Sequence, residues 1–357
     1  MRNLCIIALL CALSPVLSAK TIRVLGDMTL DPNQSYAATE FHIRQSDTTL
    51  DCQGALIDGK NQVMTGVRIV SDGKTPLRNV TVKNCQFKNF TSSGIRVYWQ
   101  GNDTLKLKYS VNERYRLAPQ QIKLLNITVE DTAKSAVYID DYVQDVLIDG
   151  LKVRRSGALG VYLEHHSRRT TVQNSLFEQN GFRQGKAVRE GLAIDSSTDN
   201  IIRNNIFKGN AKGGVFLYKN CGEQFSGGKS VLRTDHASRN LIEGNTFIDM
   251  PHGVWVASRQ SRNLSKWDCG DTPLDSRKTY YEDFARNNTV KGNQFCGIAQ
   301  PVIVEDNQNS VTDNRYDQAP QGFLTITQPP RERLRGQPVV GTVQRNNQLD
   351  AQACRLR

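Results

Sequence analysis

A short apolar motif recurs along the chain at a nearly constant spacing. Each copy has a small residue, an apolar residue, a variable residue and a second apolar residue. The eight copies begin at Gly66, Gly94, Ala136, Gly160, Gly191, Gly214, Gly253 and Pro301. Where nothing is inserted, the copies lie 24 residues apart (Val137 to Val161) or 23 apart (Leu192 to Val215). Self-similarity at this period is typical of a solenoid.

A second marker precedes each later copy of the motif by about eight residues. It is an Asn or Gly followed three residues later by an apolar residue. The pairs are Asn84 with Phe87, Asn126 with Val129, Gly150 with Val153, Asn174 with Phe177, Asn204 with Phe207, Gly244 with Phe247 and Gly292 with Phe295. Short β-branched segments between Asn, Gly and Asp turns indicate β-strands, so the sequence predicts a β-solenoid.

In a parallel β-solenoid, equivalent residues of successive coils stack about 4.8 Å apart. We therefore expect one all-β domain, a single parallel β-helix with about eight or more coils. Residues 20–58 are predicted to form an N-terminal cap and the first coil, because a solenoid core needs protection at its open ends. The β-helix is predicted over residues 59–316. Residues 317–357 lose the period and are expected to form a C-terminal cap or a partly disordered tail.

The first residues have the composition of a secretory signal peptide, predicted at residues 1–19. Arg2 supplies the charged start, residues 5–13 form the apolar run, and residues 17–19 resemble a cleavage site. The apolar run is too short to span a membrane. The sequence thus predicts a periplasmic or secreted protein without a transmembrane segment.

Cysteine usage agrees with export. Six cysteines follow the predicted signal peptide, at positions 52, 85, 221, 269, 296 and 354. An even number in an oxidising compartment favours disulfides. Cys221 and Cys269 fall in long loops after neighbouring coils and are predicted to pair, whereas Cys52 and Cys85 could pair or pack in the core.

The net charge of +11 restricts the partners. A basic exported protein can attract nucleic acid, membrane or an acidic polysaccharide. The chain has no nucleic-acid-binding module and no amphipathic basic helix, so we expect an acidic polysaccharide as the partner. The sequence leaves the oligomeric state open, with a monomer as the expectation.

Four insertions interrupt the period, at residues 99–121, 181–188, 220–238 and 259–285. The three longest leave the same end of the same predicted strand. Insertions on one edge of a solenoid usually wall a binding face.

Three carboxylates occupy one outward column on consecutive predicted coils: Asp140, Glu164 and Asp195. Like charges this close repel, so the row should either raise a pKa or hold a cation. We take Ca²⁺ as the candidate cofactor, with these three residues as ligands, because it takes several oxygen ligands. His165 and Lys219 lie in the next column as candidate bases.

Other outward side chains complete the predicted site. Tyr162 and Tyr218 are candidate catalytic acids beside the carboxylate row. Aromatic rings suit stacking on sugars, and polar side chains suit their hydroxyl and carboxylate groups. The predicted substrate-binding residues are Arg96, Tyr98, Tyr138, Asp141, Arg189, Glu190, Phe216 and Trp255.

The opening Leu50-Asp51-Cys52-Gln53-Gly54, the coil pattern of residues 199–207 and the acidic column resemble the right-handed parallel β-helix superfamily of carbohydrate-active proteins. The resemblance covers residues 45–316 and implies a right-handed helix. The superfamily includes pectate-lyase-like and chondroitinase-B-like lyases, mannuronan epimerases, polygalacturonase-like hydrolases and NosD-like proteins. The chain lacks the epimerase Asp-Pro-His-Asp motif, and Ser196-Ser197 stands where chondroitinase-B-like lyases carry a Lys.

The leading hypothesis is a lyase that removes the C5 proton of a uronic acid unit in an acidic polysaccharide. It needs charge neutralisation, a base and an acid. A C5-epimerase would use similar groups. An inverting glycoside hydrolase is an alternative, because Asp140 and Asp195 are two coils, or about 9.5 Å, apart. A NosD-like or carbohydrate-binding solenoid without activity is the third.

Overall fold

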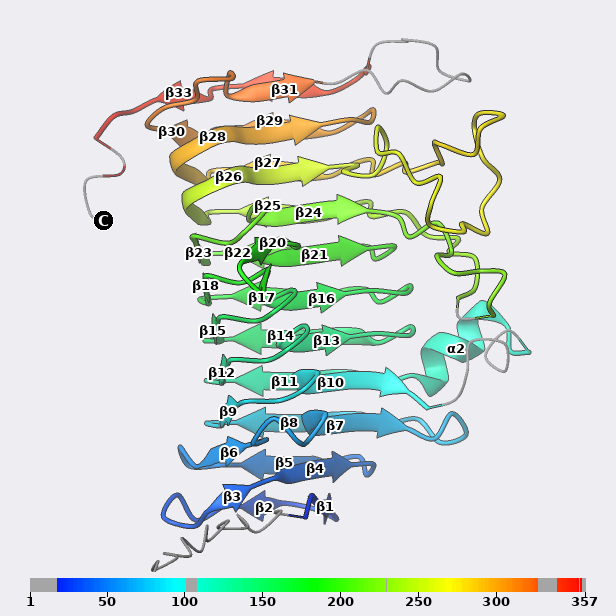
Figure 1. Cartoon of the computed structure of the whole chain (residues 1–357), viewed down its shortest axis with the longest axis vertical. Coiled ribbons are helices and arrows are strands. Elements are labelled where there is room, and N and C mark those ends of the chain that lie inside the picture. The colour runs from blue at the N-terminus through cyan, green and yellow to red at the C-terminus, as the bar shows by residue number, and fades with distance from the viewer. Residues whose placement is uncertain (1–17, 101–107, 229, 327–338, 353, 355–357) are drawn as a thin grey trace, which may run out of the picture.

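The computed structural model describes residues 18–100, 108–228, 230–326, 339–352 and 354. The predicted signal peptide therefore lies outside the described residues, apart from its last two positions. The described chain forms one elongated stack of coils with loops projecting from one side (Figure 1). No helix in this described part is long and apolar enough to cross a membrane.

Each full coil contributes strands to three columns, and neighbouring strands in every column are parallel. The motif strands form the first column: β1 (Lys20–Val24), β4 (Thr39–Ile43), β7 (Thr65–Ser71), β10 (Ser93–Trp99), β13 (Val137–Ile139), β16 (Val161–Leu163), β21 (Leu192–Asp195), β24 (Val215–Tyr218), the end of β26 (Thr246–Val256), the end of β28 (Gln294–Val304), and β31 (Leu324–Ile326).

The second column contains the marker strands. These are β3 (Tyr36–Ala37), β6 (Leu56–Asp58), β9 (Gln86–Lys88), β12 (Thr128–Glu130), β15 (Lys152–Arg154), β18 (Leu176–Glu178), β23 (Ile206–Lys208), the beginnings of β26 and β28, β30 (Arg315–Tyr316), and β33 (Gln348–Leu349).

The third column is a separate sheet of 11 strands. It contains β2 (Met28–Thr29), β5 (Thr48–Asp51), β8 (Arg78–Lys83), β11 (Gln120–Leu125), β14 (Gln144–Asp149), β17 (Thr171–Gln173), β22 (Ile201–Arg203), β25 (Leu241–Glu243), β27 (Thr289–Lys291), β29 (Ser310–Thr312), and β32 (Val343–Arg345).

The register confirms the predicted fold. Val137 pairs with Val161, and Leu192 pairs with Val215, so repeats identified in sequence are neighbours in space. The same register links all eight copies of the motif, from Val67 to Val302. The predicted stack of motif segments in one sheet is therefore correct.

Backbone geometry explains why the second marker begins with Asn or Gly. Asn84, Asn126 and Asn204 have φ angles of 56°, 53° and 55°, and Gly244 has 64°. This left-handed conformation turns the chain between the third and second columns. Among common residues, Gly and Asn adopt it at the lowest cost.

The core explains the remaining marker positions. The rings of Phe177, Phe207, Phe247 and Phe295 stack at centroid distances of 4.6, 5.1 and 4.9 Å. A Cβ atom built on Gly214 would overlap the ring of Phe247 and approach the carbonyl oxygen of Gly253 at 2.7 Å. The small residue that opens the motif thus makes room for the Phe of the next marker along the chain.

Buried asparagines form two ladders that the sequence analysis missed. In one, the side chain of Asn205 donates to Asn245, which donates to Asn293, which donates to Asn314, at 2.9–3.0 Å. A second ladder runs through Asn200, Asn240, Asn288 and Asn309. Each amide oxygen also accepts a backbone N–H of the preceding coil, which satisfies buried turn donors.

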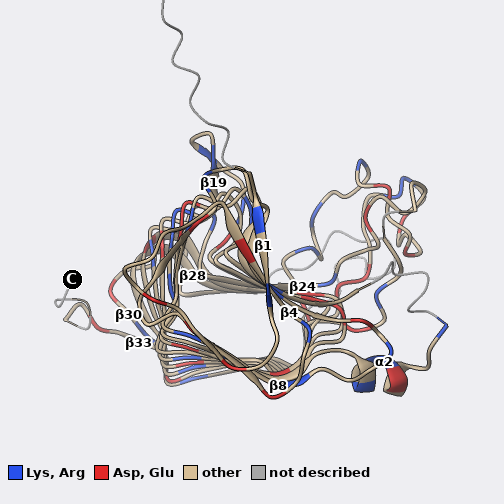
Figure 2. Cartoon of the chain, turned by 90° about the horizontal axis from the view of Figure 1, so that it is seen from below, with Lys and Arg blue, Asp and Glu red and all other residues tan. Residues whose placement is uncertain are grey.

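The insertions gather beside one corner of the coil, whereas the short hairpin of β19 (Phe182–Arg183) and β20 (Lys186–Ala187) lies at another corner (Figure 2). The described part of the first insertion includes the helix α2 (Val111–Leu117), which the sequence analysis did not predict. Ser110 and Glu113 form its capping box, a pattern readable in sequence.

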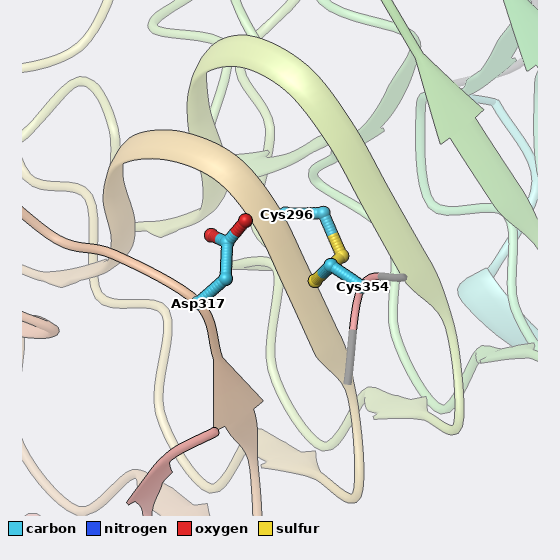
Figure 3. A group of neighbouring side chains, drawn as sticks. All are labelled: Cys296, Asp317 and Cys354. Carbon is cyan, nitrogen blue, oxygen red and sulfur yellow. A yellow bond between two sulfur atoms is a disulfide. The ribbon is translucent and has the colours of Figure 1, made fainter. Parts of the chain in front are cut away.

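Three disulfides close the fold. Cys221–Cys269 confirms the predicted pair and joins two insertions, with a Cα–Cα distance of 5.2 Å. Cys52 and Cys85 also pair, on adjacent coils. Cys296 binds Cys354, which ties the end of the described chain to β28 beside Asp317 (Figure 3).

Replacement of Gly214 by Ala tests the packing of the motif. We expect the free energy of unfolding to fall by about 1–3 kcal/mol, because the methyl group meets backbone and a packed ring. Gly227→Ala is the matched control, since its nearest neighbour is 3.6 Å away and its loop position is exposed. Urea unfolding measures both variants, and equal stability of the two would contradict this account of the repeat.

Candidate active site

A cavity of about 530 Å³ lies over the outer face of the first column, beneath the 220–238 insertion. We call it the acidic cavity. Its lining includes Arg96, Tyr98, Tyr138, Asp140, Asp141, Tyr162, Glu164, His165, Asn220 and Arg233. Most of the residues predicted from sequence around Asp140 and Glu164 therefore do face one space.

Asp140 lies at the cavity surface next to a cation. A guanidinium nitrogen of Arg96 donates to its carboxylate at 2.8 Å. The same guanidinium lies over the rings of Tyr98 and Tyr138, 4.6 and 4.9 Å from their centroids. Arg96 thus neutralises Asp140, and the two aromatic rings hold Arg96 in place.

Glu164 has a different environment, one coil further along. The hydroxyl of Tyr138 donates to its carboxylate, and Asn220 and Arg233 lie 3.4 Å from its other oxygen. Burial raises the pKa of Glu164 to about 7, with further contributions from the charges of Asp140 and Asp195. Near neutral pH, Glu164 is therefore a carboxyl group that can carry and release a proton.

Asp195 stacks in the predicted column but does not line the acidic cavity. Its side chain is fully buried and accepts hydrogen bonds from the Tyr162 hydroxyl at 2.7 Å and the Ser196 hydroxyl at 2.9 Å. It also accepts the backbone N–H of Asn220 at 2.8 Å. Its placement suits orientation of Tyr162 and of the 220–238 insertion.

Lys219 also lies away from the cavity lining. Its ammonium group forms a 2.6 Å ion pair with Asp271, and its backbone N–H donates to Asp283 at 2.8 Å. Both partners belong to the 259–285 insertion. Stacking placed the Lys219 backbone correctly, but the insertion directs its side chain.

His165 and Asp141 form a close pair at the floor of the acidic cavity. The Nδ1 atom of His165 is 2.8 Å from Asp141 and 3.9 Å from Asp140. Asp141 and His165 both have left-handed backbones, with φ of 49° and 54°, so equivalent turns stack on adjacent coils. This stacking brings the imidazole to the carboxylates.

Asp140, Asp141 and His165 have ligand atoms that all lie within 4.8 Å of one another. Carboxylate and imidazole donors suit several divalent metals. This group shares only Asp140 with the predicted calcium ligands, so the calcium site remains a prediction. The other close group, Cys296, Asp317 and Cys354, does not fit a thiolate metal site because the disulfide joins both sulfur atoms (Figure 3).

A second cavity, of about 350 Å³, follows the acidic cavity along the stack. We call it the cationic cavity. Five of the predicted site residues line it: Arg189, Glu190, Phe216, Tyr218 and Trp255. Sequence reasoning missed Lys212, Arg259, Arg262 and Trp267, three of which belong to the 259–285 insertion. The sequence identified that insertion as a wall, but an insertion without a repeat gives no column from which to assign residues.

Arg189 joins the two cavities. Its guanidinium donates to the hydroxyl of Tyr218 in the cationic cavity. It also lies 5.4 Å from the ring centroid of Tyr162, which lines the acidic cavity. The two cavities are therefore neighbours along the outer face of the first column, and we call them together the groove.

The fold and this groove define a right-handed β-helix protein. Residues 65–264, more than half of the chain, match the family described as the right-handed beta helix region, so the protein belongs to that family. A comparison with curated proteins finds no match.

Solved structures with the same fold include a tailspike protein of Escherichia coli bacteriophage HK620 in complex with a pentasaccharide. It is 13% identical, with a TM-score of 0.51, and the match covers 94% of this chain but 55% of the tailspike chain. The periplasmic alginate epimerase AlgG is 10% identical, with a TM-score of 0.53, over 91% of this chain and 70% of the epimerase chain. At these identities the similarity shows the shared fold.

The raised pKa of Glu164 predicts how stability depends on pH. Because the folded pKa of about 7 exceeds the ordinary value of 4.5, the unfolded chain loses this proton first as pH rises. This carboxyl therefore lowers the stability of the folded state between those values. We expect Glu164→Gln to gain stability relative to wild type, on the order of 1 kcal/mol or more, as pH rises through this window.

Urea unfolding at several pH values measures this difference. Glu243→Gln, on β25 in the third column, is the control and should follow wild type. A constant difference between Glu164→Gln and wild type at all pH values would show that Glu164 has an ordinary pKa.

Proposed function

We propose that the protein is an exported enzyme that hydrolyses glycosidic bonds of an acidic polysaccharide in this groove. The observation that carries the proposal is a pair of carboxyl groups, Asp140 and Glu164, that face one cavity in different environments. Asp140 is paired with Arg96, whereas the pKa of Glu164 is raised to about 7. A carboxylate held by a cation beside a carboxyl group that keeps its proton near neutral pH suits the two roles of glycoside hydrolysis.

In this mechanism Glu164 donates its proton to the glycosidic oxygen as the bond to the sugar breaks. Asp140, on the adjacent coil about 5 Å away along the stack, attacks the anomeric carbon. Glu164 then removes a proton from water, which releases the sugar from Asp140. This spacing favours retention of configuration. The inverting pair considered from sequence, Asp140 with Asp195, is less suitable because Asp195 is fully buried under Tyr162.

Two kinds of support come from outside the site. The solved structures with this fold include proteins named as a tailspike with a bound pentasaccharide and as an alginate epimerase. Such likeness gives the fold and leaves the function to the site. Three disulfides fit a periplasmic or extracellular location, which the predicted signal peptide would provide.

A lyase acting on a uronic acid unit is the second candidate. The cationic side chains of the groove favour it, because elimination needs a neutralised sugar carboxylate. The two bases predicted from sequence are less available than this route requires. Lys219 is paired with Asp271 and does not line the acidic cavity, and the Nδ1 atom of His165 is directed at Asp141. A C5-epimerase would meet the same difficulty.

The activity test uses a panel of uronic acid polymers with the mature protein. We expect new reducing ends without the ultraviolet absorbance of an unsaturated product. Glu164→Gln and Asp140→Asn should each lower kcat about 100-fold or more, since each removes a group that acts in the transition state. Glu243→Gln should retain activity. Unsaturated products would support the lyase, and full activity in both carboxyl variants would remove this pair from the mechanism.

Calcium is tested separately. Dialysis against a chelator should leave the rate of hydrolysis unchanged, because the proposed route uses the carboxyl groups directly. A loss of activity that Ca²⁺ restores would instead support the calcium site predicted at Asp140, Glu164 and Asp195 and would contradict direct acid catalysis. Metal content measured before and after dialysis provides the control.

A further inference from the structure

The cationic cavity carries more positive charge than its own carboxylates neutralise. Arg189, Lys212, Arg259 and Arg262 line it, together with one acidic residue, Glu190. Two of the cations have carboxylate partners. Arg189 lies 3.2 Å from Glu190, and Arg259 is paired with Glu223 from the neighbouring insertion.

Lys212 and Arg262 have no such partner. Among the described residues, no carboxylate oxygen lies within 4 Å of either charged group. Arg262 keeps an exposed side chain, and its partial burial together with the positive charge of Arg259 lowers its pKa. Burial, then Arg262, likewise lowers the pKa of Lys212. The positive charge of Arg259 thus disfavours the charged form of Arg262, and that of Arg262 disfavours the charged form of Lys212, so an anion bound in the cavity would relieve the repulsion.

Two buried donors also point to a ligand. The Arg259 side chain is 6% exposed, and its Nε atom has no hydrogen-bond acceptor among the described residues. The indole N–H of Trp255 is also buried and has no hydrogen-bond acceptor among the described residues. Buried donors without acceptors are costly unless a ligand or water satisfies them.

Aromatic side chains complete the cavity. Trp255 packs edge-on against Phe216, with centroids 5.4 Å apart, and both line the space. Trp267 lies under the guanidinium groups of Arg259 and Arg262, 4.8 and 4.5 Å from its ring centroid. An aromatic surface beside fixed cations matches a sugar ring that bears an anionic group.

We propose that the cationic cavity is a subsite for a sugar unit carrying an anionic substituent, a carboxylate or a sulfate ester. Arg262 and Lys212 bind the anion, and Trp255 contacts the ring. Trp255 lies three coils beyond Tyr162, about 14 Å along the stack, so the unit bound here is remote from the bond at Glu164. This inference rests on the proposed function, because it makes the cavity the part of the groove that selects acidic chains.

Binding to the Glu164→Gln protein tests the subsite without turnover. Isothermal titration calorimetry would use three anionic hexasaccharides: galacturonate, mannuronate and sulfated chondroitin. Galacturonate hexamer with its carboxyl groups reduced to hydroxymethyl is the matched neutral probe. We expect at least one anionic hexamer to bind more tightly than the neutral probe, with affinity that falls as salt rises. Binding of a galacturonate or mannuronate hexamer indicates carboxylate recognition. Because sulfated chondroitin carries carboxylates as well, sulfate recognition is indicated when its binding is lost after chemical desulfation.

Charge removal then assigns the subsite. Arg262→Gln and Lys212→Gln, each added to Glu164→Gln, should weaken the anionic hexamer about 10-fold and leave the neutral probe unchanged. Arg277→Gln is the control, because Arg277 is in the same insertion with a side chain 82% exposed. Circular dichroism confirms the fold of each variant.

The possible results separate this inference from the proposed function. Unchanged affinity in both charge variants, or binding of no anionic hexamer, would overturn the subsite even if the wild-type enzyme hydrolyses a polymer. Charge-dependent binding with no turnover of any polymer would support the subsite and remove the hydrolase proposal.

Discussion

The structure depends on the parallel register that places each residue above its equivalent in the next coil. Backbone hydrogen bonds of three columns impose this register. The buried asparagine ladders reinforce it at the turns, because each amide can bond correctly only when the next Asn lies in the same position one coil away. A shift of one residue would leave these buried amides unsatisfied, at a cost of about 1–3 kcal/mol for each group.

The same register creates the chemistry of the groove. It places Asp140, Glu164 and Asp195 on successive coils, where their charges repel. The protein accommodates the row by giving each carboxyl a different partner. Arg96 neutralises Asp140, Tyr162 and Ser196 bind Asp195, and Glu164 between them takes up a proton near pH 7. A poised acid follows from stacking three carboxyls on a scaffold too rigid to separate them.

The features that could be predicted from sequence are those at positions that recur in every coil. Val137 and Val161 are equivalent in sequence and paired in space, so the fold, the register and the acidic row were predictable. The asparagine ladders were also predictable, since Asn205, Asn245 and Asn293 each directly follow the first residue of a marker and therefore stack. Arg233 and Arg259 were not predictable, because they lie in insertions that no period places.

Lys219 shows that the stacking of coils determines the position of a backbone but not the direction of its side chain. Its column position made it a candidate base, yet it binds Asp271 of the insertion that forms the wall. Asp283, from the same insertion, accepts the backbone N–H of Lys219 at 2.8 Å and that of Arg259 at 3.0 Å. With the Cys221–Cys269 disulfide, these contacts fix both walls to the ends of adjacent coils. A polar column residue can thus support the cavity instead of facing it, because a wall without secondary structure needs buried polar anchors to keep a defined position.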